Sequence, residues 1–190
     1  MIKRIKLFFK NIPLAVKIYS AFRRLVKIDT NQFRSVRLML EKQDREYLKQ
    51  NPILTDLHHE LNELRDAQNK KWKSHVYCDG YFYQGFQKIG ISGIKPTERR
   101  MENYSINQYF DKTKSCLDIG SNAGFLSCHL AESVKLVDAI ELNPFLLKMG
   151  EAVKSFLELQ NVNFIHGDFI SYEFQKKYDL IFSLSVCCIM

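Results

Sequence analysis

Three acidic side chains stand where chemistry could occur, each near the end of a short apolar segment. Asp118 lies in the run before a glycine-punctuated turn, Glu141 lies 21 residues after Gly120, and Asp168 follows a third apolar run. A carboxylate at the position of Glu141 can accept hydrogen bonds from both hydroxyls of a ribose. Asp168 could accept from the exocyclic amine of an adenine, with Phe169 beside the ring. Together these residues predict a site for a nucleotide-like cofactor.

The turn after Asp118 contains Gly120 and Gly124, with Ser121 and Asn122 between them. A strand that feeds a helix through such a turn brings backbone N–H groups close to a ligand at the start of the helix, where the partial positive charge favours anions. Asparagine tolerates left-handed backbone angles better than other non-glycine residues, so Asn122 is compatible with the turn. Asp118 could orient this turn or receive an ammonium group.

The elements that must position these groups alternate in βαβ fashion from residue 115 onward. We predict strands over 116–119, 135–141, 162–166 and 178–184, and helices over 123–133 and 144–160. This pattern is half of a doubly wound parallel sheet, an α/β Rossmann-like fold of about four strands. Right-handed crossovers place the first strand centrally and bring the carboxyl ends of the strands to one edge, where ligands bind. The three acids are therefore expected at that edge.

The chain divides into four parts. Residues 1–28 carry apolar side chains spaced three or four apart with Lys and Arg between them, which predicts a basic amphipathic helix. The pattern over residues 29–75 predicts a helical hairpin. Residues 76–114 combine glycines and aromatic side chains with short lead-in helices. Residues 115–190 form the predicted cofactor-binding core.

The net charge of +7 belongs to the first of these parts. Residues 1–28 hold eight of the 28 basic residues, so the remainder has 20 basic against 21 acidic residues, or −1. The charge of the core therefore indicates no nucleic-acid partner, whereas an anionic surface would meet residues 1–28. Attachment to an anionic membrane surface and packing of this helix on its own domain fit the pattern equally well.

No metal site is predicted. The five cysteines show no zinc-site spacing, and free thiols in a reduced compartment fit better than a disulfide framework. The adjacent His58 and His59 point in different directions on a helix, so we expect them on a solvated face.

The sequence also bears on localisation. It contains no uncharged apolar run with a cleavage site at its start, and no segment with the length and hydropathy of a transmembrane helix. We therefore expect a cytoplasmic protein, with a peripheral membrane location through residues 1–28 as the alternative.

Taken together, the motifs resemble those of the class I S-adenosylmethionine-dependent methyltransferases over residues 115–186. The likeness is carried by LDIGSNAG at 117–124, IELNP at 140–144, GDF at 167–169 and YDLIFS at 178–183. One departure is Asn122, where the commonest family pattern has glycine. The resemblance implies S-adenosyl-L-methionine as the cofactor.

The resemblance also implies a role for each motif. The glycine turn would line the methionine part of the cofactor, Glu141 its ribose, and Asp168 with Phe169 its adenine. Ser183 would border the site of methyl transfer. The predicted cofactor-binding residues are Asp118, Gly120, Ser121, Asn122, Gly124, Glu141, Leu142, Asp168, Phe169 and Ser183.

The function implied is methyl transfer to an acceptor that the sequence does not identify. The sulfonium already activates the methyl carbon, so the protein chiefly orients the nucleophile, and we assign no catalytic residue. The Asn/Asp-Pro-Pro-aromatic signature of amino-methylating relatives is absent at 183–186, which argues against an exocyclic base amine as acceptor. One alternative is a non-catalytic membrane-associated or partner-binding module on the same fold. Another is an NAD-dependent oxidoreductase, which is disfavoured because G-x-G-x-x-G is absent.

The sequence stops soon after the fourth predicted strand. Class I methyltransferases usually continue with further strands and helices, so the resemblance implies truncation at this point. Residues 187–190, CCIM, match a prenylation pattern, but they continue directly from an apolar strand. We therefore favour truncation over lipidation.

Overall fold

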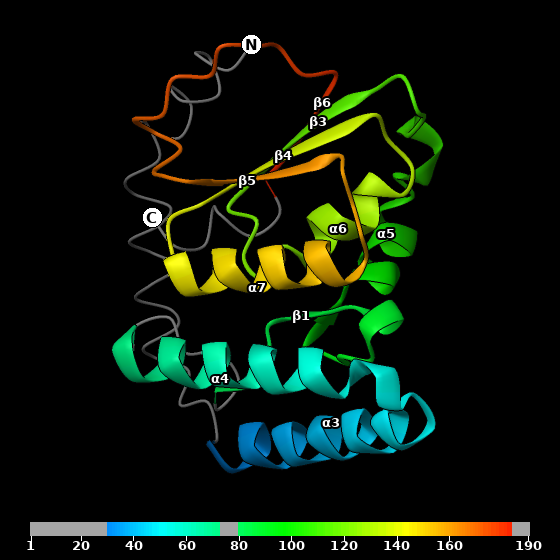
Figure 1. Ribbon diagram of the computed structural model, residues 1–190, viewed down its shortest axis with the longest axis vertical. Coiled ribbons are helices and arrows are strands. Elements are labelled where there is room, and N and C mark those ends of the chain that lie inside the picture. The colour runs from blue at the N-terminus through cyan, green and yellow to red at the C-terminus, as the bar shows by residue number, and fades with distance from the viewer. Residues whose placement is uncertain (1–29, 73–79, 184–190) are drawn as a thin grey trace.

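The computed structural model describes residues 30–72 and 80–183 (Figure 1). These residues form an α/β structure around one parallel sheet, which confirms the predicted fold class. The predicted basic helix over 1–28 and the prenylation pattern at 187–190 lie outside the described residues.

The sheet has four strands in the order β5-β4-β3-β6, all parallel. Its strands are β3 (Ser115–Ile119), β4 (Leu136–Glu141), β5 (Val162–His166) and β6 (Leu180–Phe182). In the register, Asp118 lies opposite Ala139 on one side and Phe182 on the other. The first strand of the sheet in sequence is thus an inner strand, as right-handed crossovers predict.

The helices lie on one side of the sheet in successive layers (Figure 1). Closest to it are α6 (Phe125–Ala131) and α7 (Pro144–Phe156), then α4 (Thr55–Lys71) packs on α7, and α3 (Thr30–Gln50) lies outermost. Between α4 and the sheet, the chain forms β1 (Gln84–Gly85), β2 (Lys95–Pro96) and α5 (Thr97–Tyr104). Three short 3-10 helices complete the described elements: η1 (Pro52–Leu54), η4 (Gln87–Ile89) and η5 (Asn107–Tyr109).

Helix α7 begins and ends at recognisable signals. The side chain of Asn143 accepts a hydrogen bond from the backbone N–H of Phe145 at 3.0 Å, and Pro144 occupies the first helical position. The helix ends at Phe156, four residues earlier than predicted, because Glu158 adopts a left-handed conformation with φ of 54°. The N–H of Leu159 then donates back to the carbonyl of Lys154 at 3.0 Å, which closes the helix end.

The N-terminal helices and the sheet helices share a hydrophobic core. Leu57 and Leu61 of α4 pack in one buried cluster with Phe86, with Phe125 of α6 and with Met149 of α7. Burial of a large apolar side chain stabilises a fold by roughly 1.5–3 kcal/mol. Helix α4 and the segment that carries Phe86 therefore share a core with α6, the helix that follows the glycine turn.

His58 corrects the expectation of a solvated histidine pair. Its side chain is only 3% exposed, because it lies between Leu57 and Leu61 on the buried face of α4. Its Nε2 lies 2.6 Å from the carbonyl oxygen of Ile89. His59, in contrast, is exposed and faces Glu63.

The other face of the sheet is covered by the connection between β5 and β6. Phe169 and Tyr178 from this connection pack on the apolar side chains of β3 and β4. Within this layer, Asp138 accepts hydrogen bonds from Tyr178 Oη at 2.5 Å, Asn163 Nδ2 at 2.9 Å and Lys176 Nζ at 2.7 Å. Burial raises the pKa of Asp138, but these hydrogen bonds outweigh that effect and hold the pKa below its ordinary value.

None of the helices in the described ranges is both long and apolar enough to cross a membrane.

Candidate cofactor site at the carboxyl edge of the sheet

The glycine turn joins β3 to α6 through three residues in the left-handed region. The φ angles are 69° at Gly120, 56° at Asn122 and 71° at Gly124. Asn122 thus takes the left-handed conformation that asparagine tolerates. The backbone N–H groups of Gly120 and Ser121 both donate to the carbonyl of Ile140, at 2.9 and 3.1 Å, which ties the turn to the end of β4.

Close packing explains why the last position of the turn is glycine. A Cβ atom on Gly124 would lie 2.4 Å from the ring of Phe164, which projects from β5. Gly150 of α7 approaches the same ring, and a Cβ there would lie 2.5 Å away. The two glycines let α6 and α7 come close to the sheet, and this fixes where the turn lies.

Glu141 occupies the centre of this edge. Its Oε2 accepts a hydrogen bond from the backbone N–H of Asn122 at 2.8 Å, and its Oε1 accepts from that of Asn143 at 2.9 Å. The carboxylate therefore spans the ends of β3 and β4. Each carboxylate oxygen carries two lone pairs, so Glu141 can keep these bonds and also accept from hydroxyl groups of a ligand.

Asp118 lies beneath the turn rather than in it. Its side chain is 2% exposed, and its Oδ2 accepts a hydrogen bond from Ser127 Oγ of α6 at 2.7 Å. Burial raises the pKa of Asp118 to about 6, against the lowering effects of Ser127 and Arg100 and with a smaller raising effect of Glu141. This placement favours the orienting role for Asp118, because the carboxyl group holds strand and helix together.

The remaining predicted residues are spread along the same edge. Asp168 is exposed, and its Oδ1 accepts from the N–H of Ile170 at 2.9 Å. Leu142 is 55% exposed directly after β4, and Ser183 follows β6. Phe169 is buried, with its ring centroid 6.1 Å from that of Phe174. The ring of Phe169 thus belongs to the core beneath the edge.

Buried polar atoms without a hydrogen-bond partner gather around this edge. Ser121 Oγ, Asn143 Nδ2 and Ser183 Oγ follow the ends of β3, β4 and β6. Within the described ranges, the other such side-chain atoms are Thr97 Oγ1 and Arg100 Nη1 of α5. Buried polar groups are normally hydrogen-bonded, so this group of atoms fits a polar ligand. Arg100 also lies close enough to Asp118 to lower its pKa.

Residues of the N-terminal half that sequence reasoning missed also contact the turn. Gln84 of β1 is buried and donates from Nε2 to the carbonyl of Ser121 at 3.1 Å. Its Oε1 accepts from the N–H of Phe125 at 3.1 Å. No spacing rule connects Gln84 or Arg100 to the turn, because their partners are distant in the sequence.

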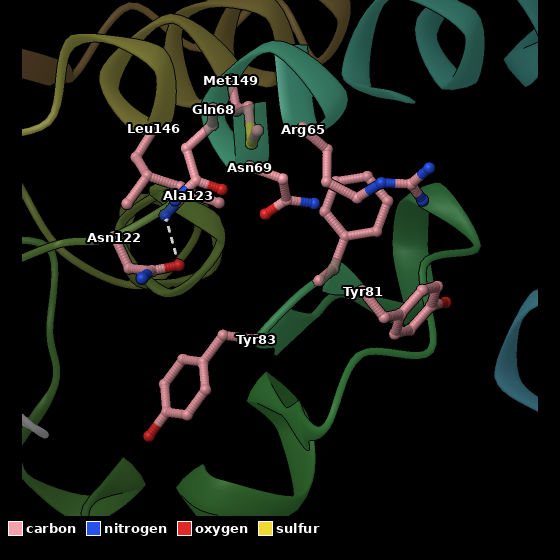
Figure 2. Close-up of a pocket in the computed structure, with 10 residues that line it drawn as sticks. Arg65, Gln68, Asn69, Tyr81, Tyr83, Asn122, Ala123, Leu146 and Met149 are labelled. Atoms are coloured by element: carbon pink, nitrogen blue, oxygen red, sulfur yellow. Dashed lines mark hydrogen bonds between the residues drawn. The ribbon is translucent and has the colours of Figure 1, made fainter. Parts of the chain in front are cut away.

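A narrow cleft lies beside the turn, bordered by α4 and α7 (Figure 2). Asn122 and Ala123 form one wall, and Figure 2 shows the bond from Ala123 N–H to Asn122 Oδ1, which is 2.8 Å long. Arg65 and Asn69 of α4 line the cleft on the other side. Helix α4 therefore borders the turn across this cleft.

The described residues contain no group of three or more His, Cys, Asp or Glu side chains that could hold a metal ion. Among the described residues, Cys116 and Cys128 are buried and form no disulfide. Burial raises the pKa of both thiols to about 12, so they stay protonated and unreactive at neutral pH.

Comparison with known proteins gives partial matches. No protein-family model matches the chain. An uncharacterised RNA methyltransferase of Mycoplasma mobile is 29% identical over 93 residues, which is 47% of this chain and 26% of that protein. The chain therefore spans about a quarter of the length of this relative.

Two solved structures also match this chain over a comparable share of its length. A dimethyladenosine transferase from Plasmodium falciparum matches with a TM-score of 0.40 and 19% identity, over 44% of this chain and 30% of that one. An S-adenosylmethionine-dependent methyltransferase from Thiobacillus denitrificans, in complex with S-adenosylhomocysteine, matches with a TM-score of 0.39 and 21% identity. The match covers 44% of this chain and 34% of that one. Over just under half of its length, this chain is thus similar in sequence to that RNA methyltransferase, and the two solved structures match it over a comparable share.

Proposed function

We propose that this chain binds S-adenosyl-L-methionine and takes part in transfer of its methyl group to an acceptor. The observation that carries the proposal is the position of Glu141. Its carboxylate is held by the N–H groups of Asn122 and Asn143, at the carboxyl edge of a parallel sheet and against a left-handed turn. An acid in this position suits a ribose diol.

The residues around Glu141 supply the other contacts in this proposal. The backbone of the turn, from Gly120 to Gly124, borders the methionine part. The buried guanidinium of Arg100 has an unpartnered Nη1, and the methionine carboxylate is an anion that suits it. When bound, the cofactor supplies a methyl carbon already activated by the sulfonium. The residues of the chain bind and orient it, and Asp168 at the exposed end of the edge borders the adenine.

Calorimetric titration tests the proposal. S-Adenosylhomocysteine should bind the full chain, and NAD should not. Glu141→Gln puts an amide N–H₂ against a backbone N–H and removes a charge-assisted bond. Since hydrogen bonds to charged groups contribute about 1.5–3 kcal/mol, the affinity should fall about tenfold to a hundredfold.

The matched control is Glu151→Gln, which changes a part-exposed glutamate of α7 that faces Lys154 and leaves the edge intact. Its affinity for S-adenosylhomocysteine should equal that of the wild type. Binding of NAD in place of S-adenosylhomocysteine, or equal affinities in the Glu141 and Glu151 variants, would contradict the proposal. Transfer of a labelled methyl group into RNA, lipid or small-molecule fractions then tests the chemical step.

A further inference from the structure

We propose that Gln84 is a positioning residue that holds the cofactor turn in its binding shape from the N-terminal half of the chain. This inference rests on the proposed function, because the ligand whose affinity Gln84 would control is S-adenosyl-L-methionine. Gln84 lies 37 residues before Ser121 and outside the segments that predict cofactor binding.

The side-chain amide of Gln84 hydrogen-bonds to the backbone at both ends of the turn. Gln84 Nε2 donates to the carbonyl of Ser121 at 3.1 Å, and Gln84 Oε1 accepts from the N–H of Phe125 at 3.1 Å. Ser121 offers only an acceptor here and Phe125 only a donor, so the two bonds fix which way the amide points. The side chain is 4% exposed, so water does not compete for either bond.

The turn needs a partner of this kind. Phe125 is the first residue of α6, and the N–H groups at a helix start have no partner within the helix. The capping position is Gly124, which has no side chain to accept from them. Asn122, a non-glycine residue with φ of 56°, adds backbone strain that neighbouring structure must offset. Gln84 therefore acts as a cap supplied from a distant part of the chain.

The position of Gln84 is itself fixed by α3. Asp44 of α3 is buried and accepts hydrogen bonds from Tyr81 Oη and, at 2.9 Å, from the N–H of Ser92. These residues flank Gln84 on both sides, and Gln84 pairs with Lys95 in the parallel β1-β2 ladder. The segment that carries Gln84 is thus tied to the N-terminal helices by a buried carboxylate.

Aromatic packing adds a second tie to the same place. The ring centroids of Phe82 and Phe86 lie 6.2 and 6.5 Å from that of Phe125. Gln84 lies between these two residues in the sequence. The amide of Gln84 and the two rings therefore hold the start of α6 from the same segment.

The test compares Gln84→Met with Val162→Ala. Methionine has nearly the length of glutamine and removes both hydrogen bonds without leaving a large gap. Val162 is fully buried at the start of β5, at the amino edge of the sheet and away from the turn, so its truncation destabilises the fold only. The dissociation constant for S-adenosylhomocysteine and the melting temperature are measured for both variants and the wild type.

We expect Gln84→Met to bind S-adenosylhomocysteine about tenfold more weakly than the wild type at a temperature where both are folded. Val162→Ala should lower the melting temperature and leave the affinity unchanged. Wild-type affinity in Gln84→Met, with a lower melting temperature alone, would make Gln84 a purely structural residue and overturn the inference. Failure of the wild type to bind S-adenosylhomocysteine would instead remove the proposed function, and this inference with it.

A measurement on the wild type covers the case in which Gln84→Met does not fold. The amide hydrogen of Phe125 should exchange slowly in the unliganded protein, because Gln84 Oε1 accepts it in a buried site. The amide of Thr113, bonded to Asp111 Oδ1 in an exposed turn, provides the comparison. Equal exchange rates for the two amides would show that Gln84 does not hold the turn.

Discussion

Asp118→Asn should remove a pH-dependent part of the free energy of unfolding. Burial raises the pKa of Asp118 from its ordinary 3.8 to about 6, while Ser127 and Arg100 oppose the rise. Well below pH 3.8 both the folded and the unfolded chain hold this proton. Between the two pKa values the unfolded chain releases the proton and the folded protein keeps it, so rising pH favours unfolding.

The size of the effect follows from the two pKa values. Each pKa unit corresponds to about 1.36 kcal/mol, so the interval from 3.8 to about 6 amounts to about 3 kcal/mol. This destabilisation is complete above about pH 6 and absent well below the ordinary pKa. Asparagine carries no charge to desolvate and still offers an oxygen to Ser127 Oγ, so the variant retains the bond that Asp118 makes.

Urea unfolding of both proteins, followed by circular dichroism between about pH 4 and pH 8, measures this contribution. The wild type contains other acids with the opposite behaviour, such as Asp138 and Asp179, whose pKa values are lowered in the folded protein. They are the same in both proteins, so the difference between the two unfolding free energies isolates Asp118. Between about pH 4 and pH 8 this difference should change by about 2–2.5 kcal/mol in favour of the asparagine variant, because part of the total of about 3 kcal/mol already acts at pH 4. A constant difference would refute the account of Asp118 as a buried acid with a raised pKa.

Two further substitutions test the packing that supports the site. Gly150→Ala should lower the free energy of unfolding by about 1–3 kcal/mol, because its Cβ would lie 2.5 Å from the Phe164 ring, and urea titration measures the loss. Tyr178→Phe should cost about 1.5–3 kcal/mol through loss of its hydrogen bond to the charged Asp138, again by urea titration, and wild-type stability in this variant would rule that bond out as a contributor.

The parallel sheet could be predicted because each of its elements carries a local signal. The apolar run at 162–166 matches β5 at both ends, and Asn143 with Pro144 marks the start of α7. The predicted end of α7 at residue 160 was wrong, because Leu157 and Leu159 continue the apolar spacing beyond Phe156, where the helix ends. The left-handed residue after a helix is usually a glycine, which the sequence would reveal, but here it is Glu158.

The candidate site likewise consists of residues that have a local sequence signal and residues that have none. The turn and Glu141 belong to one strand-turn-helix-strand unit, so a spacing of about 20 residues is enough to place them together. Gln84 and His58 depend on contacts between distant parts of the chain, 41 residues for Gln84 to Phe125 and 31 for His58 to Ile89. A glutamine and a histidine with these partners have no periodicity that distinguishes them from surface residues. Their burial follows from the packing of α4 against α7 and of β1 against α6, which is also why the N-terminal half should influence cofactor affinity.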